Sequence, residues 1–360
     1  MLFDGIILKS VLHIEQERTG ASIYYLLTGN RSIQTLQDAH MYRLDHFYGI
    51  HKSLTKKRID RKIQELIQNG LLKEKTDEAN RRFLLSTDKT AIWLERNQST
   101  LPFHYFNGIT FHEKAEVFYQ RLLLLIQTFT NTKSGNYSFI PVVDQPIAVR
   151  WVKRFYKRMK GNELDYLLAL EEELQHLLIG FPDTHASIFV ERLSGYKHYG
   201  KSIAQLTDDY DSDENDIQLL LVGILHSILT NIQKNEADFP ALSIMLEDQK
   251  NVIKLLDSTA KTYQLYKQNH TAEQIAKIRR LKINTVYDHL AEISLYDPGF
   301  PFTNYISKPE QQEILSAIEQ TKTYKLKAIK EKVNPEISFF QIRLMLVLHH
   351  QLKEVGETNA

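Results

Sequence analysis

The chain contains no cysteine, and glycine and proline are scarce, with 14 and 9 among 360 residues. The lack of cysteine excludes disulfide bonds, thiol catalysis and cysteine metal sites, and it suits a reducing cytosol. Strand-like alternation is also rare, and most of the sequence repeats its apolar residues with the 3.6-residue period of a helix. We therefore predict a mainly α fold with small β-wings at most.

The chain also lacks excess charge and long apolar runs. It carries 45 basic and 44 acidic residues, a net charge of +1, so any nucleic-acid surface must arise from uneven distribution of charge. The longest apolar stretch, Leu219–Leu229, is interrupted by Gly223, His226 and Ser227 and is too short to cross a bilayer. The start, MLFDGIILKS, lacks the features of a signal peptide. We expect a cytoplasmic protein without membrane contact.

The length exceeds that of one compact core, and a hydrophobic content of 42% is ordinary for a globular protein. We predict a multi-domain protein with winged-helix or helix-turn-helix units. Residues 1–100 form a winged-helix-like domain, and residues 101–180 form a helical middle with a basic helix. Residues 181–255 form a second helix-turn-helix-like unit, and residues 256–360 form a C-terminal helix-turn-helix domain.

The winged helix is predicted from three helices and a hairpin. The helices are expected at Ser22–Leu27, Ile33–Tyr48 and Thr55–Gln68, and Leu71–Ser86 would form a small N-terminal β-wing. The third helix would be the recognition helix. The candidate DNA-binding cations of this helix and the wing are Lys56, Lys57, Arg58, Arg61, Lys62, Arg81 and Arg82. The alternative is a solvated basic face.

A second basic cluster lies in the segment RWVKRFYKRMK, which has six basic residues and no acid. Helical spacing places five of its cations on one face and the apolar residues on the other. Such a helix could lie along a phosphate backbone, a membrane or an acidic protein tail, or simply face solvent. We favour nucleic acid, because nothing else in the chain indicates a membrane. The five cations are Arg150, Lys153, Arg154, Lys157 and Arg158.

One segment matches the phosphate-loop pattern of nucleotide-binding proteins. Gly195–Ser202 reads GYKHYGKS, in which Lys201 would reach the phosphates and Ser202 would hold magnesium. The preceding residues ERLS do not form a buried strand, and Tyr196 is one of three bulky residues inside the loop. We expect instead that Gly195 ends one helix and that Lys201 and Ser202 open the next. No catalytic residue, cofactor or metal site is expected elsewhere.

Six acidic residues follow this loop. They precede a long helix and complement its positive N-terminus, and the set lacks the glycine and terminal glutamate of a calcium loop. They would repel DNA, so this unit is expected to pack or to meet a protein. The residues are Asp208, Asp209, Asp211, Asp213, Glu214 and Asp216.

The segment HTAEQIAKIRRLKINTVYDHL, residues 270–290, predicts a helix-turn-helix. Thr271 is a candidate N-cap, and Ile275 and Ala276 supply the inner face. Leu281, Val286 and Leu290 would bury the second helix. The side chains expected outside are Asn284, Thr285, Asp288 and His289. A helical hairpin that only packs is the alternative.

Two features of this segment weaken the case for DNA contact by the second helix. Arg280 occupies the turn position that often carries glycine, so we expect an irregular turn. Residues 283–307 contain no Lys or Arg, although phosphate attraction supplies most non-specific DNA affinity. The candidate DNA-binding cations are therefore Lys277, Arg279, Arg280 and Lys282, with Asn284 and Thr285 beside them. A protein dock is the other interpretation.

The runs TAEQIAKIRRLKINTVYDHL, KLKAIKEKV and EISFFQIRLMLVL resemble the helix-turn-helix domain at the C-terminus of some bacterial RecQ-family helicases. The whole chain resembles the Firmicutes YpbB family, which carries this domain without a helicase motor. The resemblance implies an accessory protein that acts with a RecQ-like helicase, RecS, in DNA repair or replication restart. It offers no catalytic residue.

The leading hypothesis is thus a non-enzymatic protein that binds DNA, whether duplex, forked or single-stranded, and a RecQ-like helicase. A winged-helix transcriptional regulator is the first alternative, and it requires a preferred duplex sequence. A nucleotide-dependent enzyme that uses Gly195–Ser202 is the second.

Overall fold

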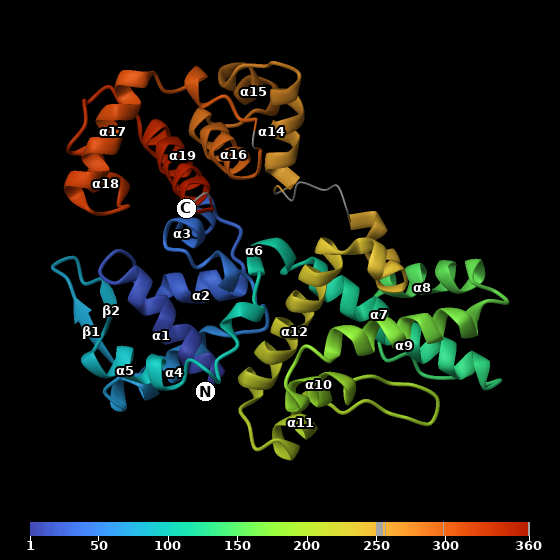
Figure 1. Ribbon diagram of the computed structural model, residues 1–360. Coiled ribbons are helices and arrows are strands. Elements are labelled where there is room, and N and C mark those ends of the chain that lie inside the picture. Colours follow the sequence, from blue (N-terminus) through green and yellow to red (C-terminus); the bar gives the residue numbers. More distant parts are fainter. Residues whose placement is uncertain (250–254, 256, 298, 359–360) are drawn as a thin grey trace.

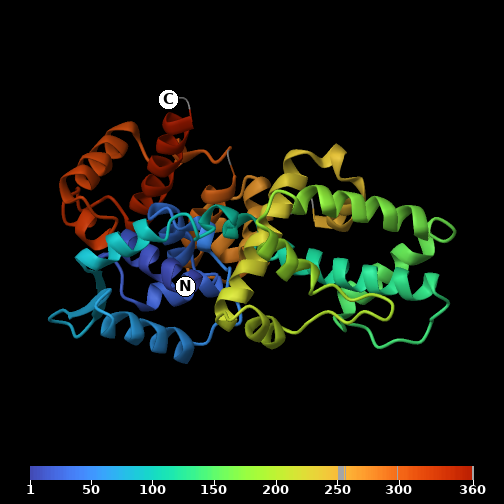
Figure 2. The same ribbon diagram turned by 60° about the horizontal axis from the view of Figure 1, so that its bottom comes forward.

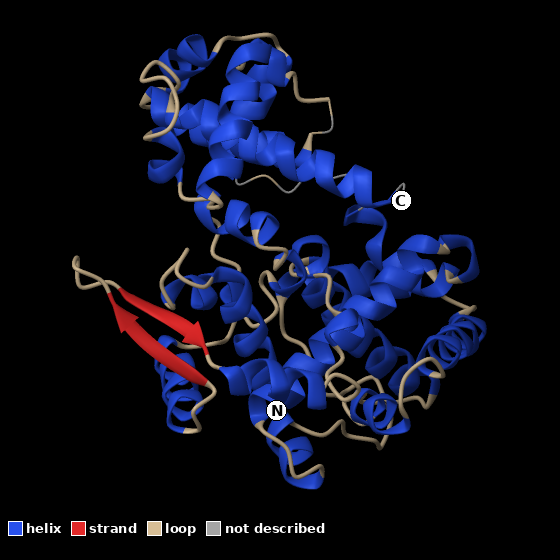
Figure 3. Ribbon diagram, turned by 60° about the vertical axis from the view of Figure 1, so that its left-hand side comes forward, coloured by secondary structure: helices blue, strands red, loops and turns tan. Residues whose placement is uncertain are grey.

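The computed structural model describes residues 1–249, 255, 257–297 and 299–358. The described chain is mainly helical, as predicted, and its sheet is a single antiparallel pair of strands. Figure 1 shows an N-terminal domain in blue, a helical body in green and yellow beside it, and a C-terminal domain in orange and red. Figure 3 shows the sheet projecting from one side of the molecule, below the C-terminal domain.

The N-terminal domain has the predicted order of helices followed by a β-hairpin. Its strands pair in a register that runs from Leu72 opposite Ser86 to Thr76 opposite Arg82. Gly70 supplies the left-handed turn before the hairpin, with a φ of 70°. The elements are α1 (Leu2–Ile14), α2 (Ala21–Thr28), α3 (Ile33–Met41), η1 (Asp45–Phe47), α4 (Lys56–Gln68), β1 (Leu72–Thr76), β2 (Arg82–Ser86) and α5 (Asp88–Arg96).

Two parts of this domain differ from the prediction. Helix α3 ends at Met41 rather than Tyr48, because Arg43 takes a left-handed φ of 53° and the chain turns into η1. Helix α1 was not predicted. Its apolar residues are buried on several sides, as at Phe3, Ile6 and Ile7, so the stripe of a surface helix is absent.

The helical body combines the predicted middle with most of the unit that follows it. Tyr166 of α9 donates a hydrogen bond to the Ala241 carbonyl at 2.7 Å. Glu173 of the same helix accepts the backbone N–H groups of Ala241 and Leu242 at 2.7 and 2.8 Å. These bonds join the first part of the body to its end. Its elements are η2 (Phe103–Tyr105), α6 (Gly108–Phe111), α7 (Lys114–Lys133), α8 (Pro146–Arg158), α9 (Glu163–Leu178), α10 (Asp183–Val190), α11 (Ile203–Asp209), α12 (Glu214–Lys234), η3 (Glu236–Asp238), α13 (Pro240–Ser243) and η4 (Ile244–Gln249).

Helix α12 contains the apolar run that was expected to be too short for a membrane. At 21 residues it is the one helix of the described chain that is long and apolar enough to span a bilayer. However, 61% of its most apolar window is buried inside the protein. It packs against α1, α7 and α10, which is the position of a core helix.

The C-terminal domain rests on the N-terminal domain through α16 and α19, which both contact α3. The amide of Gln37 in α3 donates to the backbone carbonyl of Arg343 at 3.4 Å. The elements of the C-terminal domain are α14 (Asp257–Lys267), α15 (Ala272–Arg279), α16 (Ile283–Tyr296), η5 (Phe302–Asn304), α17 (Lys308–Thr321), α18 (Leu326–Lys330) and α19 (Phe339–Thr358).

The predicted domain boundaries remain predictions. Residues on the two sides of the boundary at 180 and 181 pack into one helical body, as the bonds from α9 to α13 show. The predicted boundary between residues 255 and 256 lies next to residues 250–254 and includes residue 256. Residues 250–254 and 256 lie outside the described residues.

Candidate nucleic-acid interface

Helix α8 presents the basic face that its sequence predicts. All five predicted cations are exposed, whereas Ala148, Trp151, Val152 and Phe155 on the opposite side are buried. Phe155 stacks on Trp151, with the ring centroids 5.0 Å apart. The apolar face therefore holds the helix against the body while the cations face solvent. In Figures 1 and 2 the green helices that include α8 reach the end of the molecule opposite the wing.

The cations of α8 form no close ion pairs with the described chain, although the charge of Arg154 helps to lower the pKa of the nearby Asp248 carboxyl. Within the described residues, none of the five forms an ion pair with a carboxylate. The Arg158 guanidinium lies over the Phe155 ring, 5.1 Å from its centroid. A row of unpaired cations at one helix face can attract the phosphates of a nucleic acid.

A buried arginine fixes α8 from behind. Arg121 of α7 is 2% exposed and lies over the Trp151 ring at 4.8 Å. Its two terminal nitrogens each donate to one oxygen of Asp248 at 2.7 Å, and one of them also donates to the Met245 carbonyl. The guanidinium holds the pKa of Asp248 below its usual range, chiefly through these hydrogen bonds. The geometry ties α7, α8 and η4 together.

The basic helix α4 is less available than its sequence indicates. Lys56, Lys57, Arg58 and Arg61 are exposed, but Lys62 is partly buried. The Arg58 guanidinium pairs with Glu214 at 2.9 Å, and Lys56 pairs with Asp60. The face is thus partly neutralised.

The partner of Arg58 belongs to the predicted acidic cluster, which packs within the chain. Asp216 of this cluster accepts the backbone N–H of Phe3 at 2.8 Å and binds the N-terminal ammonium group. Lys62 also pairs with Asp4 at 3.4 Å and Glu65 at 2.8 Å. Lys57 and Arg61 are the two cations of α4 that form no ion pair with a carboxylate of the described chain.

The wing places its two predicted cations at the start of β2. Arg81 pairs with Asp77 at 2.6 Å, and its guanidinium lies 5.7 Å from the centre of the Phe83 ring. Arg82 is exposed. The wing cations lie far along the molecule from α8, so the predicted cations do not form one continuous surface.

The predicted pair of helices at residues 270–290 is present as α15 and α16. Thr271 caps α15 in a reciprocal box with Gln274, as its position predicted. Ile275, Val286 and Leu290 are fully buried. The expected irregular turn is wrong: Arg280 itself takes the left-handed conformation, with φ 52° and ψ 45°, and so replaces the usual glycine.

His289 was expected outside but is buried. Its Nδ1 lies 2.8 Å from the Thr262 hydroxyl of α14, and burial lowers its pKa to about 4. Arg279 points toward the same helix, where it donates to the Ser258 carbonyl at 2.6 Å and to Thr262. The guanidinium of Arg279 therefore has a structural contact. Lys277, Arg280 and Lys282 are exposed at the turn.

Helix α16 is enclosed along much of its length. It contacts α14, α15, α19 and α3, and its residues 289–294 are buried. Asn284 and Asp288 are exposed near its start, whereas Thr285 is half-buried. The part of α16 open to a ligand is its first two turns, which is the end that contacts base edges in known helix-turn-helix complexes.

Residues 258–346 match the model of a family described as a helix-turn-helix domain. The C-terminal domain is a helix-turn-helix domain. The chain is also similar to Protein YpbB of Bacillus subtilis (strain 168), with 28% identity over 344 residues, 96% of each chain. This match confirms the resemblance to the YpbB family. No solved structure matches the chain.

The phosphate-loop match lies outside the helix-turn-helix domain, and its structure differs from a phosphate loop. The segment follows helix α10, and residues 195 and 198 form an isolated backbone bridge. Lys201 pairs with Glu191 at 2.9 Å and Asp209 at 2.8 Å, and Ser202 caps the short helix α11. A Cβ on Gly200 would lie 2.2 Å from the Arg192 carbonyl, so this glycine serves close backbone packing.

One detail expected for this loop is wrong. Helix α10 ends at Val190, so Gly195 does not terminate it. The expectation that Ser202 opens a helix is correct. In the described part of the chain, His, Asp and Glu side chains form no group of three that could hold a metal ion.

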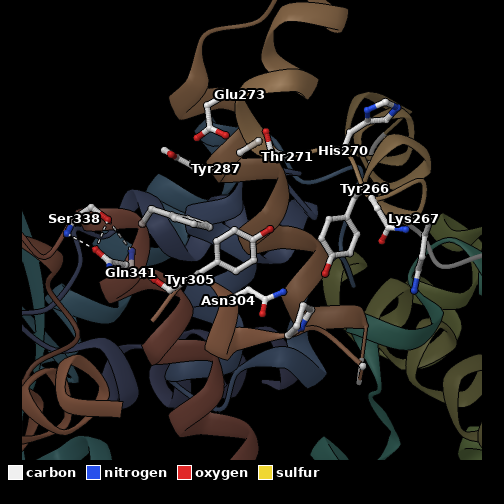
Figure 4. Close-up of a pocket in the computed structure, with 15 residues that line it drawn as sticks. Tyr266, Lys267, His270, Thr271, Glu273, Tyr287, Asn304, Tyr305, Ser338 and Gln341 are labelled. Atoms are coloured by element: carbon white, nitrogen blue, oxygen red, sulfur yellow. Dashed lines mark hydrogen bonds between the residues drawn. The ribbon is translucent and has the colours of Figure 1, made fainter. Parts of the chain in front are cut away.

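The helix-turn-helix domain also contains a cleft of about 780 Å³ that sequence reasoning missed (Figure 4). Tyr266 and Tyr305 line it, and each packs near-parallel on Phe300, with centroids 5.8 and 5.5 Å apart. Burial raises the pKa of Tyr305 to about 12, so its phenol stays protonated. The lining residues come from four separate segments, so no local motif marks the cleft. The stacked rings form one wall of the cleft and hold Tyr266 and Tyr305 in place.

Proposed function

We propose that this protein binds DNA and that the exposed face of α8 is its principal phosphate contact. The observation that carries the proposal is a set of five exposed cations on one rigid helix face, none of them paired with a described carboxylate. Each cation that neutralises a phosphate releases condensed counterions, which favours binding in dilute salt. The net charge of +1 is no obstacle, because the field acts locally.

The helix-turn-helix domain supports the same function. Its exposed cations Lys277, Arg280 and Lys282 lie at the turn before α16, beside the exposed Asn284. The first two turns of α16 would then approach the duplex, with the turn cations on the backbone. Arg279 would act indirectly by fixing α15 to α14.

The finer role that we propose is that of a non-enzymatic, cytoplasmic accessory protein to a RecQ-like helicase in DNA repair or replication restart. Its support is the similarity to YpbB over nearly the whole chain. The sequence runs TAEQIAKIRRLKINTVYDHL, KLKAIKEKV and EISFFQIRLMLVL, which resemble the domain appended to some RecQ-family helicases, add to it. The protein would hold the DNA substrate or the helicase, while the helicase would supply ATP-driven unwinding.

The test is equilibrium binding of the purified full chain to fluorescent duplex, single-stranded and forked DNA across a salt series. The same titrations are repeated with the RecQ-like helicase RecS present. We expect the logarithm of the binding constant to fall steeply and linearly with the logarithm of the salt concentration. We also expect forked DNA to bind more tightly when RecS is present. If no DNA binds at low salt, the DNA-binding proposal is wrong. If RecS changes neither affinity nor preference, the accessory role is wrong.

A further inference from the structure

Phe83 of the wing is contacted by cations from both ends of the chain. The Arg81 guanidinium and the Lys325 ammonium group each lie 5.7 Å from the centre of its ring. Lys325 also donates to the Gln16 carbonyl, and neighbouring Thr323 donates to the Glu17 carboxylate. The segment between α17 and α18 therefore rests against the N-terminal domain. Figure 2 shows the light-blue wing and the red-orange α17 and α18 on the same side of the molecule.

Further cations of the wing face the same way as Phe83. Lys75 is directly opposite Phe83 in the β-ladder, and Lys73 is opposite Leu85. Residues that face each other across an antiparallel pair project from the same side of the sheet. Both lysines are exposed, and so is Lys322, three residues before Lys325.

The acids near this surface offset only part of its charge. Asp77 pairs with Arg81, and Glu17 is held by the hydroxyl of Thr323. Glu74 faces the opposite side of the hairpin, since it is paired with Leu84. Lys73, Lys75 and Lys322 form no ion pair with a carboxylate of the described chain. The surface thus stays cationic.

We propose that the wing and the segment between α17 and α18 form one surface that binds the phosphate backbone of double-stranded DNA. The two-domain surface consists of Lys75, Arg81 and Lys325 at Phe83, with Lys73 on the same side of the hairpin and Lys322 in the segment that carries Lys325. This inference rests on the proposed DNA binding but concerns a site remote from α8, and it names the duplex as the ligand.

The burial of the Phe83 ring favours duplex over single-stranded DNA as the ligand. Proteins that bind single strands offer exposed aromatic faces on which unpaired bases stack. Phe83 is only 8% exposed and lies beneath its cations, so the two-domain surface offers charge without a stacking platform. The bases of a duplex are already stacked on each other, and its backbone needs only cations at suitable positions.

The experiment compares the full chain with the double variant Lys75→Ala, Lys322→Ala. Both residues are exposed, so their loss leaves the fold intact. We expect affinity for a 30-base-pair duplex to fall about tenfold and the salt slope to fall by about 1.8, the value for two lost phosphate contacts. Affinity for a single strand of equal length should change much less.

The matched control is Lys234→Ala, Lys261→Ala, which removes two exposed lysines from α12 and α14. It should leave the salt slope unchanged. Equal effects of the two double variants on duplex binding would overturn the two-domain surface. If substitutions in α8 still weakened DNA binding in that case, the proposed function would stand. Equal losses for duplex and single-stranded DNA would overturn the choice of ligand. Absence of wild-type DNA binding would overturn both proposals.

Discussion

Arg280 is an arginine in a backbone conformation that usually belongs to glycine. Its φ of 52° closes the turn between α15 and α16, and the next N–H, of Leu281, donates to the Ala276 carbonyl at 2.9 Å. A left-handed conformation costs an L-residue about 1 kcal/mol, because Cβ approaches the backbone carbonyl. The packing of the two helices maintains the turn despite this cost.

We predict that Arg280→Gly stabilises the helix-turn-helix domain relative to Arg280→Ala by about 0.5–1 kcal/mol. Both variants lose the same charge, but only glycine relieves the strain at φ 52°. Urea unfolding of the two proteins, followed by circular dichroism, measures the difference. An alanine variant as stable as the glycine variant would show that the turn is not strained.

His226 makes the fold sensitive to acid. It is fully buried in α12, its Nδ1 accepts the Asn107 backbone N–H at 3.2 Å, and burial lowers its pKa to about 3. The unfolded chain has a histidine pKa of about 6.5, so below that pH the unfolded state binds more protons. The stability that the fold gains from keeping His226 neutral is therefore fully present above pH 6.5, and it is lost as the pH falls toward 3.

We predict that the free energy of unfolding falls between pH 6.5 and 4.5 by about 1.4 kcal/mol per pH unit for each such histidine. His226→Gln should be less stable than wild type at pH 7 but should lose less stability on acidification. Buried His289, whose pKa is lowered to about 4, still makes the stability of that variant depend on pH. Denaturant unfolding at pH 7, 6 and 5 tests this, and parallel pH profiles for the two proteins would contradict it.

At the scale of elements, α8 depends on an ion pair whose two partners differ in burial. The side chain of Arg121 is 2% exposed, whereas that of Asp248 is 51% exposed. Removing the carboxylate leaves a guanidinium in the interior without its counter-charge, which is costly. Removing the arginine instead leaves a carboxylate that water can solvate.

We predict that Asp248→Ala destabilises the helical body by about 3 kcal/mol, and that Arg121→Met costs about 1 kcal/mol or less because methionine can pack on Trp151. Chemical denaturation followed by Trp fluorescence compares them. If Arg121→Met proved the more damaging change, the contacts of the guanidinium with Trp151 and the Met245 carbonyl would outweigh its burial cost.

The elements that the sequence predicts well are those with a strong local pattern. Helix α8, the wing and the α15–α16 pair all carry periodic apolar residues or clear caps, and each is present where the sequence predicts it. The wing lies close to its predicted bounds, whereas α8 begins four residues early, at Pro146, and α16 continues six residues further, to Tyr296. Helix α1 was missed because apolar residues surround it, and α3 was predicted too long because nothing in its pattern marks the left-handed turn at Arg43.

At the scale of the molecule, the contacts between distant segments could not be predicted. The pairing of Arg58 with Glu214 joins residues 156 positions apart and removes charge from the predicted recognition helix. The contact of Lys325 with Phe83 joins the C-terminal domain to the wing. His289 was expected to face solvent, because α14 lies outside the segment from which its position was deduced. The spacing of apolar residues predicts which face of a helix is buried, but it does not predict which distant segment packs against that face.

The central claim is that α8 provides the principal phosphate contact. The most direct test is the salt dependence of duplex binding by Arg154→Glu, Arg158→Glu against the control Lys234→Glu, Lys261→Glu, which reverses two exposed charges elsewhere. We predict that the α8 variant loses about 1.8 units of salt slope, about 0.9 for each of the two lost contacts, and more than tenfold in affinity, while the control keeps the wild-type slope. An α8 variant with the wild-type slope and affinity would contradict the claim.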